Sequence, residues 1–184
     1  LCVACVMYSA FTNFDKTKIM ALVSDTLIEL LQYRINEEEV SSRLYLAMAM
    51  CLEKEGYFGA AKLWKKYSSE ELIHADWARD FLLAMDIKPE TRPLREVQTM
   101  FPGYLPEIID LTVQHEYMVT AQCEALAKAA LTDFNFKVFV LAQKYVAEQI
   151  EELEKVHNLK DRLETFGRDS VNLRLFDKEL GKLA

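Results

Sequence analysis

Four stretches of the sequence carry polar side chains at positions where a helix would bury apolar ones. In each stretch, apolar residues recur with the three- or four-residue spacing of one helix face. A polar residue at such a core position is unfavourable unless it has a function. The stripes are interrupted by Glu38, Glu71, His74, Glu116 and Gln149, with Glu152 on the edge of the last stripe. Carboxylate and imidazole groups bind metal ions, so these interruptions indicate a metal site.

The interruptions lie at matching depths along the expected helices. One in each helix, namely Glu38, Glu71, Glu116 and Gln149, falls roughly eleven to fifteen residues from its helix start, which is near mid-helix at about 1.5 Å per residue. Four helices packed as a bundle would place these groups in one layer of the core. Buried carboxylates without partners cost several kcal/mol each. No Lys or Arg is expected in the stripes at this level, so the neutralising charge must come from elsewhere.

Two divalent cations would supply that charge. They balance four ionised carboxylates, namely Glu38, Glu71, Glu116 and Glu152. The spacing Glu71-x-x-His74 places a carboxylate and an imidazole on adjacent turns of one helix face. Four-helix bundles that hold two metal ions use inward glutamates and Glu-x-x-His pairs of this kind. The sequence therefore predicts a dinuclear metal site.

Each of these residues taken alone has a simpler explanation. A single histidine such as His74 on an apolar face is more often a hydrogen-bonded core residue than a ligand. The acidic run at residues 148–154 would also suit a solvated helix face. Tyr45, on the first stripe, would suit packing with a hydrogen-bonded hydroxyl. The coincidence of four interruptions at one level is what favours the metal site.

The elements that must position this layer are four long helices and a short fifth. The expected ranges are 24–55, 58–85, 105–131, a fourth helix from Asp133 or Asn135 to Phe166, and 171–180. Residues 86–104 contain three prolines and cannot continue a helix. The fold class is therefore all-α, a four-helix bundle with a long crossover between helices two and three and a short C-terminal helix.

Composition limits the classes of function. The chain has 184 residues, of which 51% are hydrophobic and 28% charged, the balance of one globular domain. The formal net charge of −7 argues against nucleic-acid binding and suits a protein that attracts cations. No segment is long and apolar enough to span a membrane. We expect a cytoplasmic protein without nucleic-acid or membrane partners.

The N-terminal residues are set apart from the expected fold. Residues 1–20 contain a short apolar run without a basic leader, and the helical pattern begins near Met20. We therefore expect an extension at 1–20 and a single domain at 21–184. Cys2 and Cys5 have metal or redox spacing, but no second pair completes a zinc or iron–sulfur set. Cys51 and Cys123 are expected to be reduced core residues.

Five strings carry a family resemblance, in order and on the expected helices. They are NEEEVSSRLYLAM, SSEELIHADWARDFL, QHEYMVTAQ, YVAEQIEELE and FDKEL. Together they resemble a non-haem ferritin of the prokaryotic type, over about residues 30–180. The resemblance implies an iron storage subunit that binds iron(II), oxidises it with dioxygen as a ferroxidase and stores iron(III) mineral in a homo-oligomeric cage of 24 subunits.

The resemblance also implies a ligand set. Glu38, Glu71 and His74 would hold one iron. Glu71 would bridge to a second iron held by Glu116 and Glu152. Gln149 would lie beside the second iron, and Tyr45 matches a tyrosine close to the two irons. A third, outer iron site would be formed by Glu70, Glu148, Glu151 and Glu152. The helical phase supports the outer site less well, because Glu148 and Glu151 point away from the apolar stripe.

Several features separate this chain from related groups. Gln149-x-x-Glu152 replaces a second Glu-x-x-His pair, which disfavours bacterioferritin and rubrerythrin, and no methionine is placed to bind haem. Lys144 stands where some relatives have a tryptophan, so electron donation from that position loses support. The alternatives are a diiron peroxidase or oxygenase on the same bundle, or a structural bundle that binds no metal.

Overall fold

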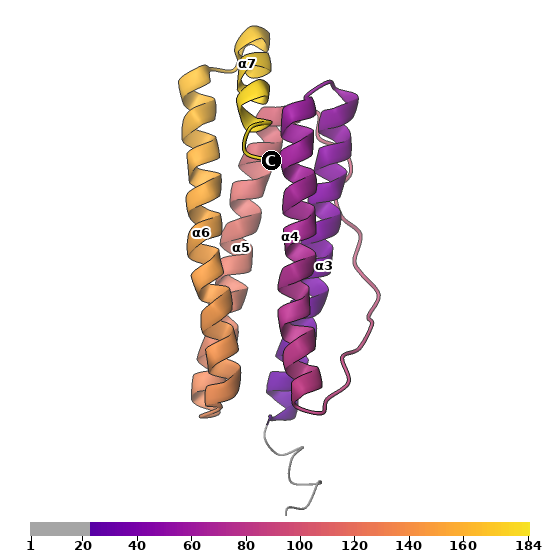
Figure 1. Ribbon diagram of the computed structural model, residues 1–184, viewed down its shortest axis with the longest axis vertical. Helices are drawn as coiled ribbons and strands as arrows, with labels where there is room; N and C mark the ends of the chain where they lie inside the picture. Colours follow the sequence, from indigo (N-terminus) through magenta and orange to yellow (C-terminus); the bar gives the residue numbers. More distant parts are fainter. Residues whose placement is uncertain (1–22) are drawn as a thin grey trace, which may run out of the picture.

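The computed structural model describes residues 23–184, and within that range it contains five α-helices and no β-strand. Four long helices run side by side along the long axis of the molecule, and the short fifth packs at one end (Figure 1). In the labels of Figure 1 the helices are α3 (Asp25–Lys54), α4 (Phe58–Ala84), α5 (Tyr104–Thr132), α6 (Phe136–Phe166) and α7 (Ser170–Leu180). The predicted all-α bundle with a short C-terminal helix is confirmed.

The four long helices form two hairpins, α3 with α4 and α5 with α6. Residues 85–103 cross over between the hairpins along one side of the bundle, as predicted from their prolines (Figure 1). Side chains of α3 hold this crossover in place. The backbone N–H of Glu90 donates to Gln32 Oε1 at 3.0 Å, and Asn36 Nδ2 donates to the Pro93 carbonyl at 3.2 Å.

Polar side chains begin two of the helices, and a glycine ends one, where the sequence predicts. Ser24 caps α3, its hydroxyl accepting from the Leu27 N–H at 3.3 Å. Asn135, rather than Asp133, caps α6 by accepting from the Val138 N–H at 3.2 Å. Gly167 follows α6 with a φ of 92°, a conformation that favours glycine.

Helix α7 packs against the start of α4 at very short range. A Cβ atom on Gly59 would lie 1.9 Å from the Asp177 carbonyl oxygen, so only glycine permits this approach. The Asp177 carboxylate accepts from the Ala60 N–H at 2.8 Å. The contact closes one end of the bundle.

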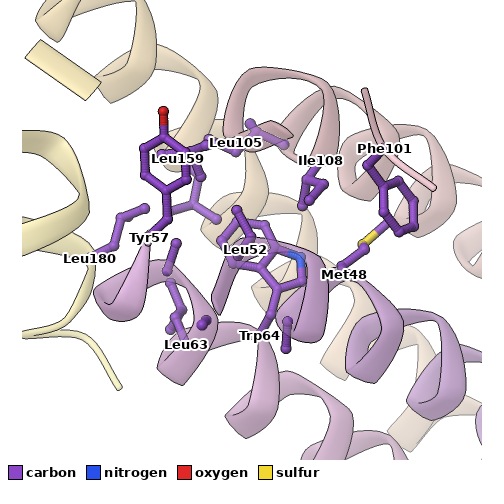
Figure 2. Close-up of a cluster of buried hydrophobic side chains, with 14 of the residues drawn as sticks. Met48, Leu52, Tyr57, Leu63, Trp64, Phe101, Leu105, Ile108, Leu159 and Leu180 are labelled. Atoms are coloured by element: carbon purple, nitrogen blue, oxygen red, sulfur yellow. The ribbon is translucent and has the colours of Figure 1, made fainter. Parts of the chain in front are cut away.

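The apolar core consists of two clusters. One gathers side chains from all five helices at the end of the bundle that α7 covers, among them Leu52, Trp64 and Leu105 (Figure 2). The other fills the opposite half and includes Leu31, Leu82 and others from α3 to α6. Buried polar groups on the same helices lie between these clusters in sequence, at the level where the apolar stripes are interrupted.

Some predictions fall outside the described residues. The proposed extension at 1–20 and the pair Cys2 and Cys5 belong to the part that is not described. Cys51 is half-buried and Cys123 is buried, and both are free thiols. No helix within residues 23–184 has the length and apolarity needed to cross a membrane.

Candidate metal centre

Three side chains from two helices meet in the core at the level of the polar layer. Each of Glu38, Glu71 and His74 offers one ligand atom, and these atoms lie within 4.8 Å of one another. All three side chains are buried. Glu71 and His74 share a face of α4 because they are three residues apart, with His74 Nδ1 at 3.3 Å from Glu71 Oε2. Glu38 faces them from α3, so the structure brings three of the predicted ligands together.

Glu116 brings a further buried carboxylate from α5. Its Oε1 accepts a hydrogen bond from the Tyr45 hydroxyl. Its Oε2 has no hydrogen-bond partner among the described residues, and the same is true of Oε2 of Glu38. A buried carboxylate oxygen without a partner is costly, and a bound cation would satisfy it. The residues present therefore fit a metal ion.

The fourth helix contributes Gln149 and Glu152, both buried. Gln149 Oε1 accepts from the Thr120 hydroxyl at 2.9 Å, which holds its amide beside α5. Glu152 Oε1 lies 2.7 Å from Nζ of Lys155, whose side chain is 39% exposed. Glu152 thus lies at the edge of the layer, as its position on the edge of the stripe predicts.

Burial makes these carboxyl groups weak acids in the metal-free protein. Desolvation raises the pKa of Glu38 to about 8, although the charge of Arg34 acts in the opposite direction. Desolvation likewise raises the pKa of Glu116 to about 7, with the charge of Glu152 adding to it against the hydrogen bond from Tyr45. The pKa of Glu71 is raised well above its usual value by burial and by the charge of Glu116. Protons therefore compete with metal ions for this layer.

The residues of the predicted outer site are less closely grouped. Glu148 Oε1 lies 3.6 Å from His74 Nε2, and the Glu148 side chain is partly exposed. Glu70 is half-buried and Glu151 is exposed. Among residues 23–184 the metal-ligand cluster consists of Glu38, Glu71 and His74 alone. The outer site stays a prediction.

The expectation that no cation lies in the layer is wrong. Arg34 is buried, and its Nε lies 2.8 Å from Glu38 Oε1. The pair is four residues apart on α3, so both side chains follow the same stripe. The signal was present in the sequence, because Arg34 follows Leu31 by three residues and takes the place of an apolar residue.

Two further polar residues near the centre were missed. His115 accepts from or donates to the Ser41 hydroxyl at 2.7 Å, and its ring meets the Tyr45 ring edge-on at 5.5 Å. Burial, helped by the charge of Arg34, lowers the pKa of His115 to about 4, so the ring is neutral. Tyr145 donates from its hydroxyl to the His74 carbonyl at 2.6 Å. The His115 ring thus supports the Tyr45 ring, and the Tyr145 hydroxyl holds the α4 backbone at His74.

Lys144 has a defined place beside the centre. Its Nζ lies 3.6 Å from the centroid of the Trp77 ring, a cation–π contact. The Trp77 ring in turn lies 4.7 Å from the His74 ring. Position 144 therefore carries a charge over a tryptophan of α4.

Two bacterial proteins are similar to this chain over most of its length. A probable bacterial non-heme ferritin-like protein of Haemophilus influenzae is 30% identical over 168 residues, which cover 89% of this chain and 98% of that protein. A bacterial non-heme ferritin of Escherichia coli is 30% identical over 164 residues, covering 88% of this chain and 98% of that protein.

A solved ferritin structure is similar to this chain in fold. A structure described as a novel open pore ferritin from the hyperthermophilic archaeon Archaeoglobus fulgidus superposes with a TM-score of 0.82 at 28% identity, over 86% of this chain and 98% of that chain. The family model of the ferritin-like domain matches residues 28–166, which include all four long helices almost completely. With this bundle, this centre and this match, the chain belongs to the ferritin family.

Proposed function

We propose that this chain is an iron storage subunit, which binds iron(II) in its buried carboxylate layer and oxidises it with dioxygen. The observation that carries the proposal is the convergence of Glu38, Glu71 and His74 within 4.8 Å. The carboxylate oxygens of Glu38 and Glu116 that have no hydrogen-bond partner support it, because a bound cation would stabilise them in the buried layer. The names of the bacterial relatives as non-heme ferritins agree with it.

The ligand assignment follows the sequence prediction. Glu38, Glu71 and His74 would bind one iron, and Glu71 would bridge to a second iron bound by Glu116 and Glu152. Carboxylate oxygens with one imidazole suit iron(II), and anionic oxygen ligands stabilise iron(III) still more strongly. Gln149 is held beside the second position by Thr120. The third iron, near Glu148, belongs to the same proposal.

The reaction needs two electrons, and each iron(II) supplies one as dioxygen is reduced. The residues contribute a fixed spacing between the two metal positions, so that both electrons reach the same dioxygen molecule. The raised pKa values of Glu38 and Glu116 mean that these groups release protons when iron binds. Tyr45 holds Glu116 in place during these changes.

Storage requires more than one subunit, because a single bundle has no space for a mineral. We propose a homo-oligomeric cage of 24 subunits, as the family resemblance implies. Large apolar side chains on the bundle surface, such as Phe136, Val140 and Ile150, are available for subunit contacts. A cytoplasmic location remains a prediction from the sequence.

The test is an anaerobic iron(II) titration of the metal-free protein, followed by exposure to oxygen, with particle size measured on the same sample. Two or three irons per chain, rapid oxidation and particles of about 24 chains are expected. Two irons on a small oligomer, with turnover but no stored iron, would instead indicate a diiron peroxidase or oxygenase. Absence of stoichiometric binding would leave only a structural bundle.

A further inference from the structure

A buried arginine contacts the proposed metal centre. The Arg34 side chain is 2% exposed, and its Nε lies 2.8 Å from Glu38 Oε1. Its Nη1 donates to Gln122 Oε1 at 2.6 Å, whereas Nε and Nη2 form no well-directed hydrogen bond with the described residues. Buried arginines are rare, and they usually have all their donors satisfied. A guanidinium left partly unsatisfied beside a metal ligand requires an explanation.

Its positive charge is permanent. Arginine remains protonated in proteins, and here the neighbouring Glu38 carboxylate raises the pKa of Arg34 further, against the effect of burial. Lys155 also contacts the layer, through Glu152, but its side chain is 39% exposed and solvent screens its charge. Arg34 is buried, so solvent screens its charge much less, although the carboxyl groups of Glu37 and Glu38 face it.

The contact also uses one of the two oxygens of Glu38. Oε1 faces Arg34, and Oε2 is the unpartnered oxygen that remains for a metal ion. Glu38 is thus held in place before metal binds, with one oxygen free. The arginine is a neighbour of the ligand and does not itself bind the metal.

The charge balance then depends on the oxidation state of the iron. The four buried carboxylates neutralise two divalent ions, and buried Arg34 adds one positive charge beside them. The partly exposed Glu148 and Lys155 lie at the edge of the layer. Each iron gives one electron to dioxygen. Once the reduced oxygen has left as hydrogen peroxide with two protons from solvent, the two ions together carry two more positive charges in the same buried space. Repulsion from Arg34 therefore grows when iron(II) becomes iron(III).

We propose that Arg34 is a fixed counter-charge that weakens the binding of oxidised iron more than that of iron(II), so that iron(III) leaves the centre for storage. The proposal rests on the proposed function, and it deepens that function by naming a residue that makes binding transient. A storage protein needs such a step, because a centre that kept its iron(III) could not accept the next pair. A purely structural role for the ion pair predicts no dependence on metal charge.

The experiment compares a divalent and a trivalent ion that undergo no redox reaction. Co(II) and Tb(III) are titrated into the metal-free full-length protein at one pH, in wild type, Arg34→Gln, Arg34→Lys and Arg79→Gln. Arg79 is the matched control, because it forms its ion pairs with Glu39 and Asp76 outside the centre. Binding is followed by Co(II) absorption and Tb(III) luminescence.

The expected shifts follow from net charge. If each bound ion displaces one proton, Co(II) adds one net charge and Tb(III) adds two, so the effect on the logarithm of affinity doubles. Arg34→Gln should bind Co(II) about threefold more tightly and Tb(III) about tenfold more tightly. Arg34→Lys keeps the charge and should stay within about threefold of wild type for both ions, and Arg79→Gln should match wild type.

The results that overturn the proposal are equally specific. Equal changes for Co(II) and Tb(III) in Arg34→Gln, or no change, would refute the charge effect while wild-type Co(II) binding still supported the metal centre. If Arg34→Gln does not fold, the test uses Arg34→Lys. A tenfold change in the affinity of Arg34→Lys for either ion would refute the proposal, because lysine keeps the charge. Failure of wild type to bind Co(II) stoichiometrically would overturn the metal centre and the role of Arg34 together.

Discussion

The hydroxyl of Tyr45 on α3 donates a hydrogen bond to the carboxylate of Glu116 on α5. This contact joins the two hairpins through the centre, because α3 belongs to one hairpin and α5 to the other. The ring of His115 supports Tyr45 from the side, edge-on at 5.5 Å. This hydroxyl therefore ties Glu116, a predicted ligand on one hairpin, to α3 of the other hairpin.

Removal of this hydroxyl should weaken the second metal position. Tyr45→Phe leaves Glu116 Oε1 without its donor, and the hydrogen bond from Tyr45 is one of the influences that lower the pKa of Glu116. A buried hydrogen bond is worth about 0.5–1.5 kcal/mol, so iron(II) oxidation should slow by roughly two- to tenfold. Stopped-flow absorbance measures the rate, with Tyr117→Phe as control, because the Tyr117 hydroxyl is exposed and hydrogen-bonds to His157 outside the layer. An unchanged rate in Tyr45→Phe would show that the hydroxyl does not position Glu116.

The Glu116 side chain itself should be required for rapid oxidation and dispensable for folding. Loss of groups that merely orient metal ligands costs about 10–100-fold, so Glu116→Ala should lose at least about a hundredfold in oxidation rate. The metal-free variant should still fold, because the lost hydrogen bond from Tyr45 is offset in part by the removal of a buried oxygen without a partner. Glu154→Ala, an exposed residue of the same acidic sequence run as Glu152, is the control. Normal oxidation by Glu116→Ala would remove Glu116 from the centre.

Glu38 should behave differently from Glu116 because of its partner. At about pH 9, where Glu38 is ionised, Glu38→Ala leaves Arg34 as an unpaired buried charge, which typically costs about 3–5 kcal/mol of unfolding free energy. The double variant Arg34→Met with Glu38→Leu removes both charges and should recover most of that loss. Denaturant unfolding of the metal-free proteins measures both. Full stability of Glu38→Ala alone would contradict the buried ion pair.

Stability of the metal-free protein should fall as pH rises from 5.5 to 8.5. The pKa of Glu38 is raised to about 8 and that of Glu116 to about 7, above the unfolded value of 4.5. A carboxyl group whose pKa is raised on folding contributes its full stabilisation below about pH 4.5. This stabilisation is lost as the pH rises through 7 and 8. Scanning calorimetry should show a Tm lower by several degrees at pH 8.5, restored by saturating Co(II). A metal-free Tm that rises over this range would contradict the shifts.

The helices could be predicted from the sequence because local rules govern them. Ser24 precedes an apolar stripe and caps it, and Gly167 ends α6 in the conformation that glycine favours. Three prolines exclude a continuous helix between α4 and α5 and so predict the crossover. The choice between Asp133 and Asn135 as cap stayed open, because both are good capping residues and only the turn geometry selects Asn135.

The centre was predictable in part. Glu38, Glu71 and Glu116 stood out because an acidic residue inside an apolar stripe contradicts its surroundings. Arg34 lies on the same stripe and was overlooked, since a long charged side chain is usually expected to reach solvent. The contact of Glu148 with His74 depends on how α6 sits against α4, which the spacing within one helix does not encode.

The most direct test of the metal centre is a crystal structure of the protein soaked anaerobically with iron(II), with anomalous scattering recorded at the iron edge. Two peaks per subunit are predicted, one among Glu38, Glu71 and His74 and one among Glu71, Glu116 and Glu152. Oε2 of Glu38 should contact the metal, with Oε1 still facing Arg34. Peaks elsewhere, or none in the carboxylate layer, would contradict the proposal that this layer binds and oxidises iron.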